Sequence, residues 1–221
     1  MKAIYFLFIA SIFALSIQSC REQKRPALTA TVTPTGEDSM SLILDLLSKD
    51  SLNPELWKLQ YQLFMERKDT TKAMRSLRRY TYLLPEDGNG WIEMAQIMAN
   101  QENPDVLIIT DSLSKVPDQM IRARASYIRG LYFTNTHDDS KALAAFENTI
   151  MINYTFIDAY IEKGVILYNA KKYEQALKTF QQAFKIVNNN PEIYYWIGKS
   201  YEGLGNQAEA ADWQKKYEAL K

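Results

Sequence analysis

The most constraining feature of this sequence is a pattern that recurs every 34 residues toward its C-terminal end. Each unit has a glycine, an alanine and in two cases a phenylalanine, at Gly130, Gly164, Gly198, Ala142, Ala176, Ala210, Phe146 and Phe180. A fixed period of this length indicates a stack of similar helical hairpins. One such hairpin cannot bury its own apolar face, so it packs on the next. The period therefore predicts an all-α solenoid.

The same frame extends toward the N-terminus. Trp57 and Trp91 are also 34 residues apart, and Asn-Pro dipeptides occur at 53–54, 103–104 and 190–191. Asparagine caps a helix and proline suits its first position, so each dipeptide predicts a helix start. The frame predicts repeats near 54–87, 88–122, 123–156, 157–190 and 191–221.

An aromatic residue, a glycine four positions later and an alanine twelve positions after the glycine occur twice, at Tyr160, Gly164 and Ala176 and at Tyr194, Gly198 and Ala210. This pattern resembles the tetratricopeptide repeat family. The resemblance implies a right-handed α-solenoid of about five helical hairpins. An amphipathic segment at 39–49 is predicted to form an N-terminal capping helix, so the predicted solenoid domain is 39–221.

The last predicted repeat departs from the family pattern. Gln214 and Tyr217 replace the usual aromatic residue and alanine, and no further helix is expected after Lys221. We therefore expect Trp213 and Tyr217 to form an exposed patch at the C-terminal end.

The N-terminus is typical of a secretory signal. Lys2 is followed by an apolar or small-residue run at 3–17, too short for a comfortable membrane span. Ile17-Gln18-Ser19-Cys20 resembles the lipobox of bacterial lipoproteins, in which the cysteine thiol carries a diacylglycerol. The resemblance implies a signal peptide at 1–19, lipidation of Cys20 and, from its proline and threonine content, a flexible tether at 20–38. An ordinary signal peptide with a chance cysteine is the alternative.

The residues after Cys20 bear on location. By resemblance to enteric lipoproteins, the absence of an aspartate directly after the cysteine favours the outer membrane, facing the periplasm. Arg21 stands there instead, and the charged run at 21–24 leaves the cell surface as an alternative. A third hypothesis is an adaptor anchored by an uncleaved N-terminal helix.

In tetratricopeptide proteins the first helix of each hairpin lines a concave groove that binds partners. By this resemblance the predicted groove residues are Ile92, Asn100, Tyr127, Leu131, Asn135, Ile161, Val165, Tyr168, Asn169 and Tyr195. An apolar strip edged by an asparagine ladder suits a peptide or a partner helix. The alternatives are that these side chains pack against one another or that the tether occupies the groove.

Some family members bind a C-terminal carboxylate with lysines and asparagines. Lys58 matches such a position, but Gln62 stands where asparagine is expected. Glu93 and Glu162 place acidic groups where asparagine or basic residues are usual. This kind of clamp is therefore disfavoured.

Composition narrows the chemistry. With 26 basic and 26 acidic residues the formal net charge is zero, and nothing indicates a nucleic-acid partner. Cys20 is the single cysteine, which excludes disulfides and thiolate metal sites from the rest of the chain. His137, the single histidine, lies beside Asp138 and Asp139 in a predicted turn. We expect no catalytic site, no metal and no cofactor.

Two other features have alternatives. A basic cluster of Lys72, Arg75, Arg78 and Arg79 is expected to be a solvated face, with contact to an acidic or phosphate-rich partner as the alternative. An envelope enzyme such as a peptidoglycan hydrolase would need convergent carboxylates, and we expect Asp158, Glu192 and Glu202 on separate helices. The predicted function is a membrane-anchored adaptor that binds a protein or peptide, for example within an envelope assembly complex.

Overall fold

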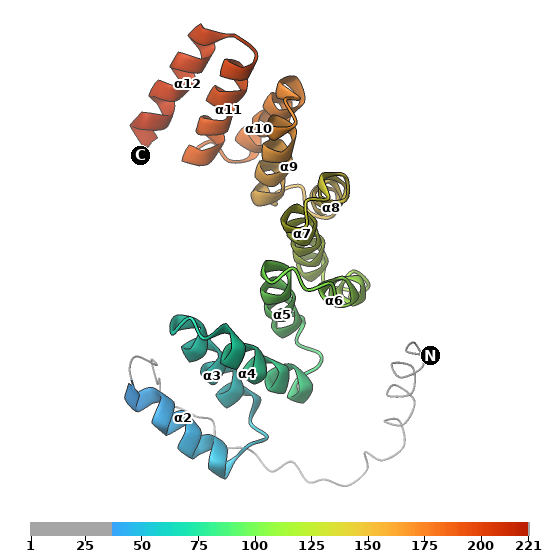
Figure 1. Ribbon diagram of the computed structural model, residues 1–221, viewed down its shortest axis with the longest axis vertical. Coiled ribbons are helices and arrows are strands. Elements are labelled where there is room, and N and C mark those ends of the chain that lie inside the picture. The colour runs from blue at the N-terminus through green and yellow to red at the C-terminus, as the bar shows by residue number, and fades with distance from the viewer. Residues whose placement is uncertain (1–36, 221) are drawn as a thin grey trace. The chain divides into compact units, whose positions relative to one another are not determined.

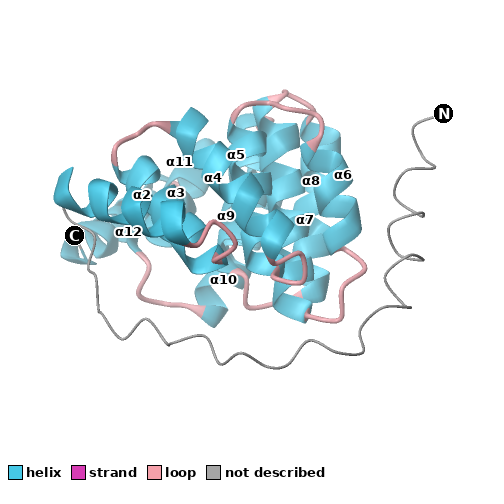
Figure 2. Ribbon diagram, turned by 90° about the horizontal axis from the view of Figure 1, so that it is seen from below, coloured by secondary structure: helices cyan, strands magenta, loops and turns pink. Residues whose placement is uncertain are grey.

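The computed structural model describes residues 37–220. The predicted signal peptide, Cys20 and nearly all of the predicted tether lie outside the described residues. Within them the chain forms eleven α-helices and no strands (Figure 1; Figure 2). Their bounds are α2 Glu37–Lys49, α3 Pro54–Glu66, α4 Thr70–Leu83, α5 Gly88–Asn100, α6 Val106–Leu113, α7 Gln119–Asn135, α8 Asp139–Ile152, α9 Ile157–Asn169, α10 Tyr173–Ile186, α11 Pro191–Gly203 and α12 Gln207–Leu220.

Ten of the described helices form five consecutive hairpins: α3–α4, α5–α6, α7–α8, α9–α10 and α11–α12 (Figure 1). We call the first helix of each hairpin its A helix and the second its B helix. Neighbouring hairpins pack directly on one another, α5 on α7 and α10 on α11 among them. The predicted all-α solenoid of about five hairpins is confirmed.

Helix α2 covers the first hairpin, as a capping helix should. It shares one buried apolar cluster with α3, made of Met40, Ile43, Leu47, Leu56 and Leu63. The helix begins at Glu37, two residues before the predicted start at Ser39. The predicted tether is therefore two residues too long.

The first aromatic residue of a repeat ties its A helix to the preceding loop. Trp57 and Trp91 each donate the indole N–H to the backbone carbonyl six residues earlier, in both cases at 2.9 Å. The Tyr194 hydroxyl makes the same bond in the fifth repeat. In these three repeats the periodic aromatic residue thus holds the start of the A helix against the preceding loop.

All five turns from A helix to B helix share one backbone conformation. The second residue after each A helix has a positive φ, at Lys68, Glu102, His137, Lys171 and Gly205. In each turn the next amide donates to the carbonyl five residues earlier, the bond that defines a Schellman motif. A left-handed conformation costs a residue with a Cβ about 1 kcal/mol. Only the fifth turn avoids this cost with glycine.

Two A-helix glycines make room for a B-helix ring. A Cβ built on Gly130 would lie 2.4 Å from the Phe146 ring, and one on Gly164 would lie 2.4 Å from the Phe180 ring. Both rings are fully buried. At Gly198 the nearest atom would be 3.4 Å away, because the fifth repeat has glutamine in place of the phenylalanine. The periodic glycine therefore has a packing role in two repeats and lacks it in the third.

The second repeat differs from expectation in its B helix. Asn103 accepts a hydrogen bond from the Asp105 amide at 2.9 Å, but α6 begins at Val106 and has only eight residues. Pro104 therefore precedes the helix and does not open it. Burial of Val106 and Leu113 keeps this short helix in the hairpin.

Candidate functional site

The predicted groove residues lie on the A helices, but two of them are not on the surface. Ile92 is 1% exposed and Ile161 is 6% exposed, so the prediction that they line a groove is wrong. Both stand eight residues before the end of their A helix, as Tyr195 does in α11. Tyr195 is 37% exposed. Helix α5 packs on α7 and α9 contacts α11, whereas no further described A helix follows α11.

The remaining predicted residues define a surface that we call the A-helix face: Asn100, Tyr127, Leu131, Asn135, Val165, Tyr168, Asn169 and Tyr195. Tyr127 is half-buried, its ring centroid 5.0 Å from Phe156. Tyr168 is half-buried 5.4 Å from Trp196. These two rings pack within the protein, as the alternative hypothesis held, while each keeps part of its surface open.

The asparagine ladder is formed by the last residues of α5, α7 and α9. Asn135 donates to the backbone carbonyl of Ala99 in the preceding repeat at 3.1 Å, and Asn100 accepts from Gln96 at 3.1 Å. Asn169 is exposed. Asn135 therefore joins two repeats, and Asn169 is the rung that offers its amide most openly.

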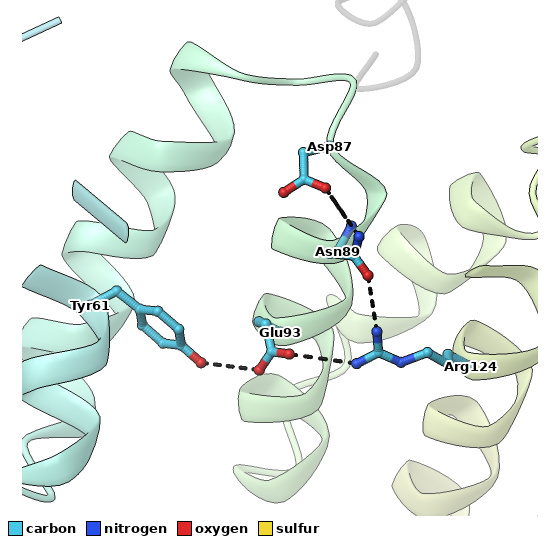
Figure 3. A network of polar contacts seen from close by, with 5 residues as sticks. All are labelled: Tyr61, Asp87, Asn89, Glu93 and Arg124. Atoms are coloured by element: carbon cyan, nitrogen blue, oxygen red, sulfur yellow. Dashed lines mark hydrogen bonds and ion pairs between the residues drawn. The ribbon is translucent and has the colours of Figure 1, made fainter. Parts of the chain in front are cut away.

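A polar network joins the A helices of the first three repeats (Figure 3). The Tyr61 hydroxyl donates to Glu93 at 3.1 Å, and the Arg124 guanidinium lies 3.5 Å from the same carboxylate. Arg124 also donates to the Asn89 side chain at 3.1 Å, and Asn89 is bonded to Asp87. Burial and the Glu93 carboxylate raise the pKa of Tyr61. The polar side chains of these three A helices thus bond to one another.

The A helices of the last two repeats carry acidic side chains that act on the same groups. Burial, then Glu192 and Asp158, raise the pKa of Glu162 above its usual value. The same three carboxylates, after burial, raise the pKa of Tyr127. A neighbouring negative charge adds to the effect of burial because it disfavours ionisation of the group. Asp158 and Glu192 are on different helices, as expected, and both act on Glu162.

Glu202 does not join this acidic group. It is on α11, the same helix as Glu192, and pairs with Lys199 at 2.5 Å. The expectation of three separate helices is therefore wrong, because Glu192 and Glu202 share α11.

An aromatic pocket of about 490 Å³ lies beside the acidic group, between α11 and α12. Its lining is Asn190, Pro191, Glu192, Tyr195, Trp196 and Tyr217. The Tyr195 ring is 5.1 Å from Trp196 and 5.7 Å from Tyr217. Trp196 also donates to the Glu192 carboxylate at 3.4 Å. The pocket therefore combines three aromatic rings with one carboxylate.

The predicted C-terminal patch is only partly open. Trp213 is half-buried, its ring 5.3 Å from Phe184 and 5.4 Å from Tyr194. Lys216 covers the Trp213 ring at 4.5 Å. Tyr217 is half-buried and belongs to the aromatic pocket. Of the two residues, Tyr217 is the one placed to touch a ligand.

Other candidate chemistry lies away from the A-helix face. In the basic cluster, Lys72 pairs with Asp69 at 2.8 Å and Arg79 lies over the Tyr82 ring. His137 is in an exposed turn. Among residues 37–220 no group of three or more His, Cys, Asp or Glu side chains is placed to hold a metal. None of the described helices is both long and apolar enough to cross a bilayer.

Trp196 and Glu162 were not predicted as site residues. A signal for Glu162 exists in the sequence, because it stands at the position of Glu93 two repeats later. Glu93 and Glu162 each precede the last residue of their A helix by seven positions. Comparing charges at equivalent repeat positions would have identified the acidic group.

Residues 164–205 match the family model described as TPR repeat, and residues 191–221 match the one described as Tetratricopeptide repeat. The Hsp70-Hsp90 organizing protein of Triticum aestivum is 25% identical over 146 residues, which are 65% of this chain and 24% of that protein. This chain thus spans about a quarter of that relative.

Solved structures with the same fold include PilW, a type IV pilus biogenesis factor (TM-score 0.69, 17% identity, 82% of this chain and 84% of that one). MamA from Desulfovibrio magneticus RS-1 is also similar (TM-score 0.61, 18% identity, 76% of this chain and 94% of that one). Residues 164–221 thus match models of the tetratricopeptide repeat, and the described part of the chain has the same fold as these solved structures.

Proposed function

We propose that this chain is an adaptor whose A-helix face binds a segment of a partner protein. The observation that carries the proposal is the contrast between the first A helices and the last ones. Near α3 and α5 the polar groups bond to one another, as Figure 3 shows. On α9 and α11, Asn169 and Tyr195 are exposed, and Tyr195 lines an aromatic pocket. Aromatic rings with open faces and a free amide suit a peptide segment.

A carboxylate-terminated segment is a poor match for this face. The similar plant protein is named for Hsp70 and Hsp90, which makes a chaperone partner worth considering. Here, however, the half-buried carboxylate of Glu162 and the exposed carboxylates of Asp158 and Glu192 would repel an anionic tail, because charges of like sign repel one another. The partner we propose is therefore not an acidic tail.

The experiment starts with the partner, identified by crosslinking in the native cell and purified. Tyr195→Ala together with Asn169→Ala removes two exposed groups of the A-helix face. Because both side chains are exposed, the fold should be little affected. We expect the dissociation constant to rise about tenfold, the effect of losing one good interfacial contact.

Tyr154→Ala is the matched control. Tyr154 is 71% exposed and lies in the loop between α8 and α9, outside the A-helix face. We expect this variant to bind like the wild type. Equal affinity for all three proteins would contradict the proposal.

We further propose that the chain is held at a membrane by acylation of Cys20, in the outer membrane facing the periplasm, within an envelope assembly complex. The lipobox-like sequence at 17–20 supports this proposal. Two or three acyl chains make a durable anchor, whereas one is marginal. Mass spectrometry of the purified N-terminus tests it: an acylated Cys20 is expected, and an intact Met1 would contradict it.

The hydrolase alternative gains one observation, the raised pKa of Glu162, which is caused by burial, Glu192 and Asp158. A carboxyl group with a raised pKa can serve as a general acid. Glu162→Gln tests this alternative, because it removes the proton donor without changing the shape of the side chain. Loss of a measured hydrolase activity in the folded variant would support the enzyme. Unchanged activity would rule out this role of Glu162.

A further inference from the structure

We propose that the partner segment presents an arginine or lysine side chain to Glu162 and Glu192, beside the aromatic pocket of Tyr195, Trp196 and Tyr217. This inference rests on the proposed function, because it names the chemistry of the partner at the same face. It is argued from an internal comparison of the repeats and from the lining of the pocket.

In the second and third repeats, the positions equivalent to Glu162 and Glu192 hold a carboxylate and an arginine. Glu93 is seven residues before the end of α5, and Glu162 is seven residues before the end of α9. In the repeat that follows Glu93, Arg124 stands eleven residues before the end of its A helix and lies 3.5 Å from the Glu93 carboxylate. The Arg124 guanidinium therefore places a positive charge next to the Glu93 carboxylate.

The equivalent position next to Glu162 holds a negative charge in place of the positive one. In the repeat that follows Glu162, the position eleven residues before the end of α11 is Glu192. A carboxylate thus stands where the preceding comparison has an arginine, and Asp158 adds to the same field. Glu162 is half-buried and Glu192 is exposed. A negative charge next to a half-buried carboxylate is unfavourable, and a cation placed beside both carboxylates relieves this. The fold leaves that cation to be supplied from outside.

No basic side chain near this group takes the role in the described structure. Lys199, on the same helix as Glu192, pairs with Glu202. Arg124, at the other side, is bonded to Asn89 and Glu93. The charge of the acidic group is therefore available to a partner.

The aromatic pocket adds a second attraction for the same chemistry. Glu192 is part of its lining, together with the rings of Tyr195, Trp196 and Tyr217. Aromatic faces attract lysine and arginine through their quadrupoles, and the attraction grows as the cation is desolvated. Arginine also offers a planar group that can stack on a ring while it bonds to a carboxylate. A basic side chain of a partner fits both parts of the site.

A metal ion is a weaker match for these carboxylates. No set of three or more potential ligand side chains converges closely enough among residues 37–220. Aromatic rings supply no ligand atoms to a hard cation. The lining therefore favours an organic cation with an apolar stem, which lysine and arginine provide.

The test uses the full chain in detergent and a peptide probe. Peptides are selected against the chain from a random library, and the tightest binder is synthesised. A second version carries citrulline for arginine and acetyl-lysine for lysine, which keeps the shape and removes the charge. The protein variants are Glu162→Gln with Glu192→Gln, and a control of equal charge change, Glu174→Gln with Glu209→Gln, at exposed acids of α10 and α12.

We expect the selected peptides to be enriched in arginine or lysine next to an apolar residue. The Glu162 and Glu192 double variant should bind the charged peptide about tenfold more weakly, while the control variant binds it like the wild type. The uncharged peptide should bind wild type and double variant equally. Circular dichroism melting confirms that each variant is folded.

Two results would overturn the inference, and they differ in what else they affect. If Tyr195→Ala with Asn169→Ala weakens binding but the glutamine double variant does not, the A-helix face binds peptides through other chemistry. Only the cation is then wrong. If none of these variants changes the affinity of the probe, the proposed function is wrong as well.

Discussion

The three periodic glycines look alike in the sequence, but the structure predicts opposite effects when each is replaced by alanine. At Gly130 the added Cβ would lie 2.4 Å from the Phe146 ring, where ordinary contact begins at 3.4 Å. The ring must move by about 1 Å, and it is fully buried. Gly164 and Phe180 repeat this geometry. At Gly198 the nearest atom is already at ordinary contact distance.

The magnitudes follow from two opposing terms. Overpacking a well-packed core costs about 1–3 kcal/mol. Replacing a glycine inside a helix by alanine contributes about 1 kcal/mol of stability. We therefore expect Gly130→Ala and Gly164→Ala to lower the free energy of unfolding by as much as about 2 kcal/mol. Gly198→Ala should raise it by as much as about 1 kcal/mol.

Thermal and urea unfolding of the full chain, followed by circular dichroism, measures all three variants under one condition. In a chain of this size 1 kcal/mol corresponds to a shift of about 2–4 °C in Tm. The first two variants should melt below the wild type and the third at or above it. Equal destabilisation at all three positions would refute the packing argument.

Three further predictions concern other parts of the fold. Burial and the neighbouring acids raise the pKa of Glu162, so the folded state holds its proton more tightly than the unfolded chain. The wild type should therefore gain stability relative to Glu162→Gln as pH falls from 7 toward the ordinary value of 4.5, and urea titrations at several pH values measure this difference; a constant difference would contradict it. His137→Gly should stabilise the protein by about 0.5–1 kcal/mol because φ is positive at this position. Gly205→Ala should destabilise it by a similar amount for the same reason. A lower Tm for His137→Gly or a higher Tm for Gly205→Ala would contradict the turn geometry. Asn135→Ala should cost about 1 kcal/mol through loss of its bond to the preceding repeat, and Asn169→Ala should cost close to nothing; equal losses on urea unfolding would show that the bond contributes nothing.

Much of the fold could be predicted because the period carries local physical signals. Trp57 and Trp91 recur together with the loop carbonyls that they bond, and Asn53 and Asn190 cap their helices as the sequence indicates. Such contacts join residues close in the chain. Local spacing is therefore enough to identify them.

The surface of the A helices was harder to predict. Ile92 and Ile161 stand at the position that is open at Tyr195, and only the packing of the next A helix distinguishes them. A repeat frame gives the position of a residue along its helix. It does not give how closely consecutive A helices approach, which decides the exposure of that position.

The acidic group illustrates the same limit. Asp158 stands four residues before Glu162 on the same helix, whereas the approach of Glu192 depends on the packing of α11 on α9. The charges and the spacing within α9 were visible in the sequence, but the approach of α11 was not. Only the comparison with Glu93 and Arg124 gives these charges a meaning for binding.

The central claim is that the open half of the A-helix face receives a partner protein. A photo-crosslinking amino acid placed at Asn169 or Tyr195, both exposed on that face, and at Tyr82, 74% exposed on α4, tests it in the native cell. We predict that the same partner is crosslinked from Asn169 and Tyr195 and not from Tyr82. Crosslinks to a partner from Tyr82 alone would contradict the claim.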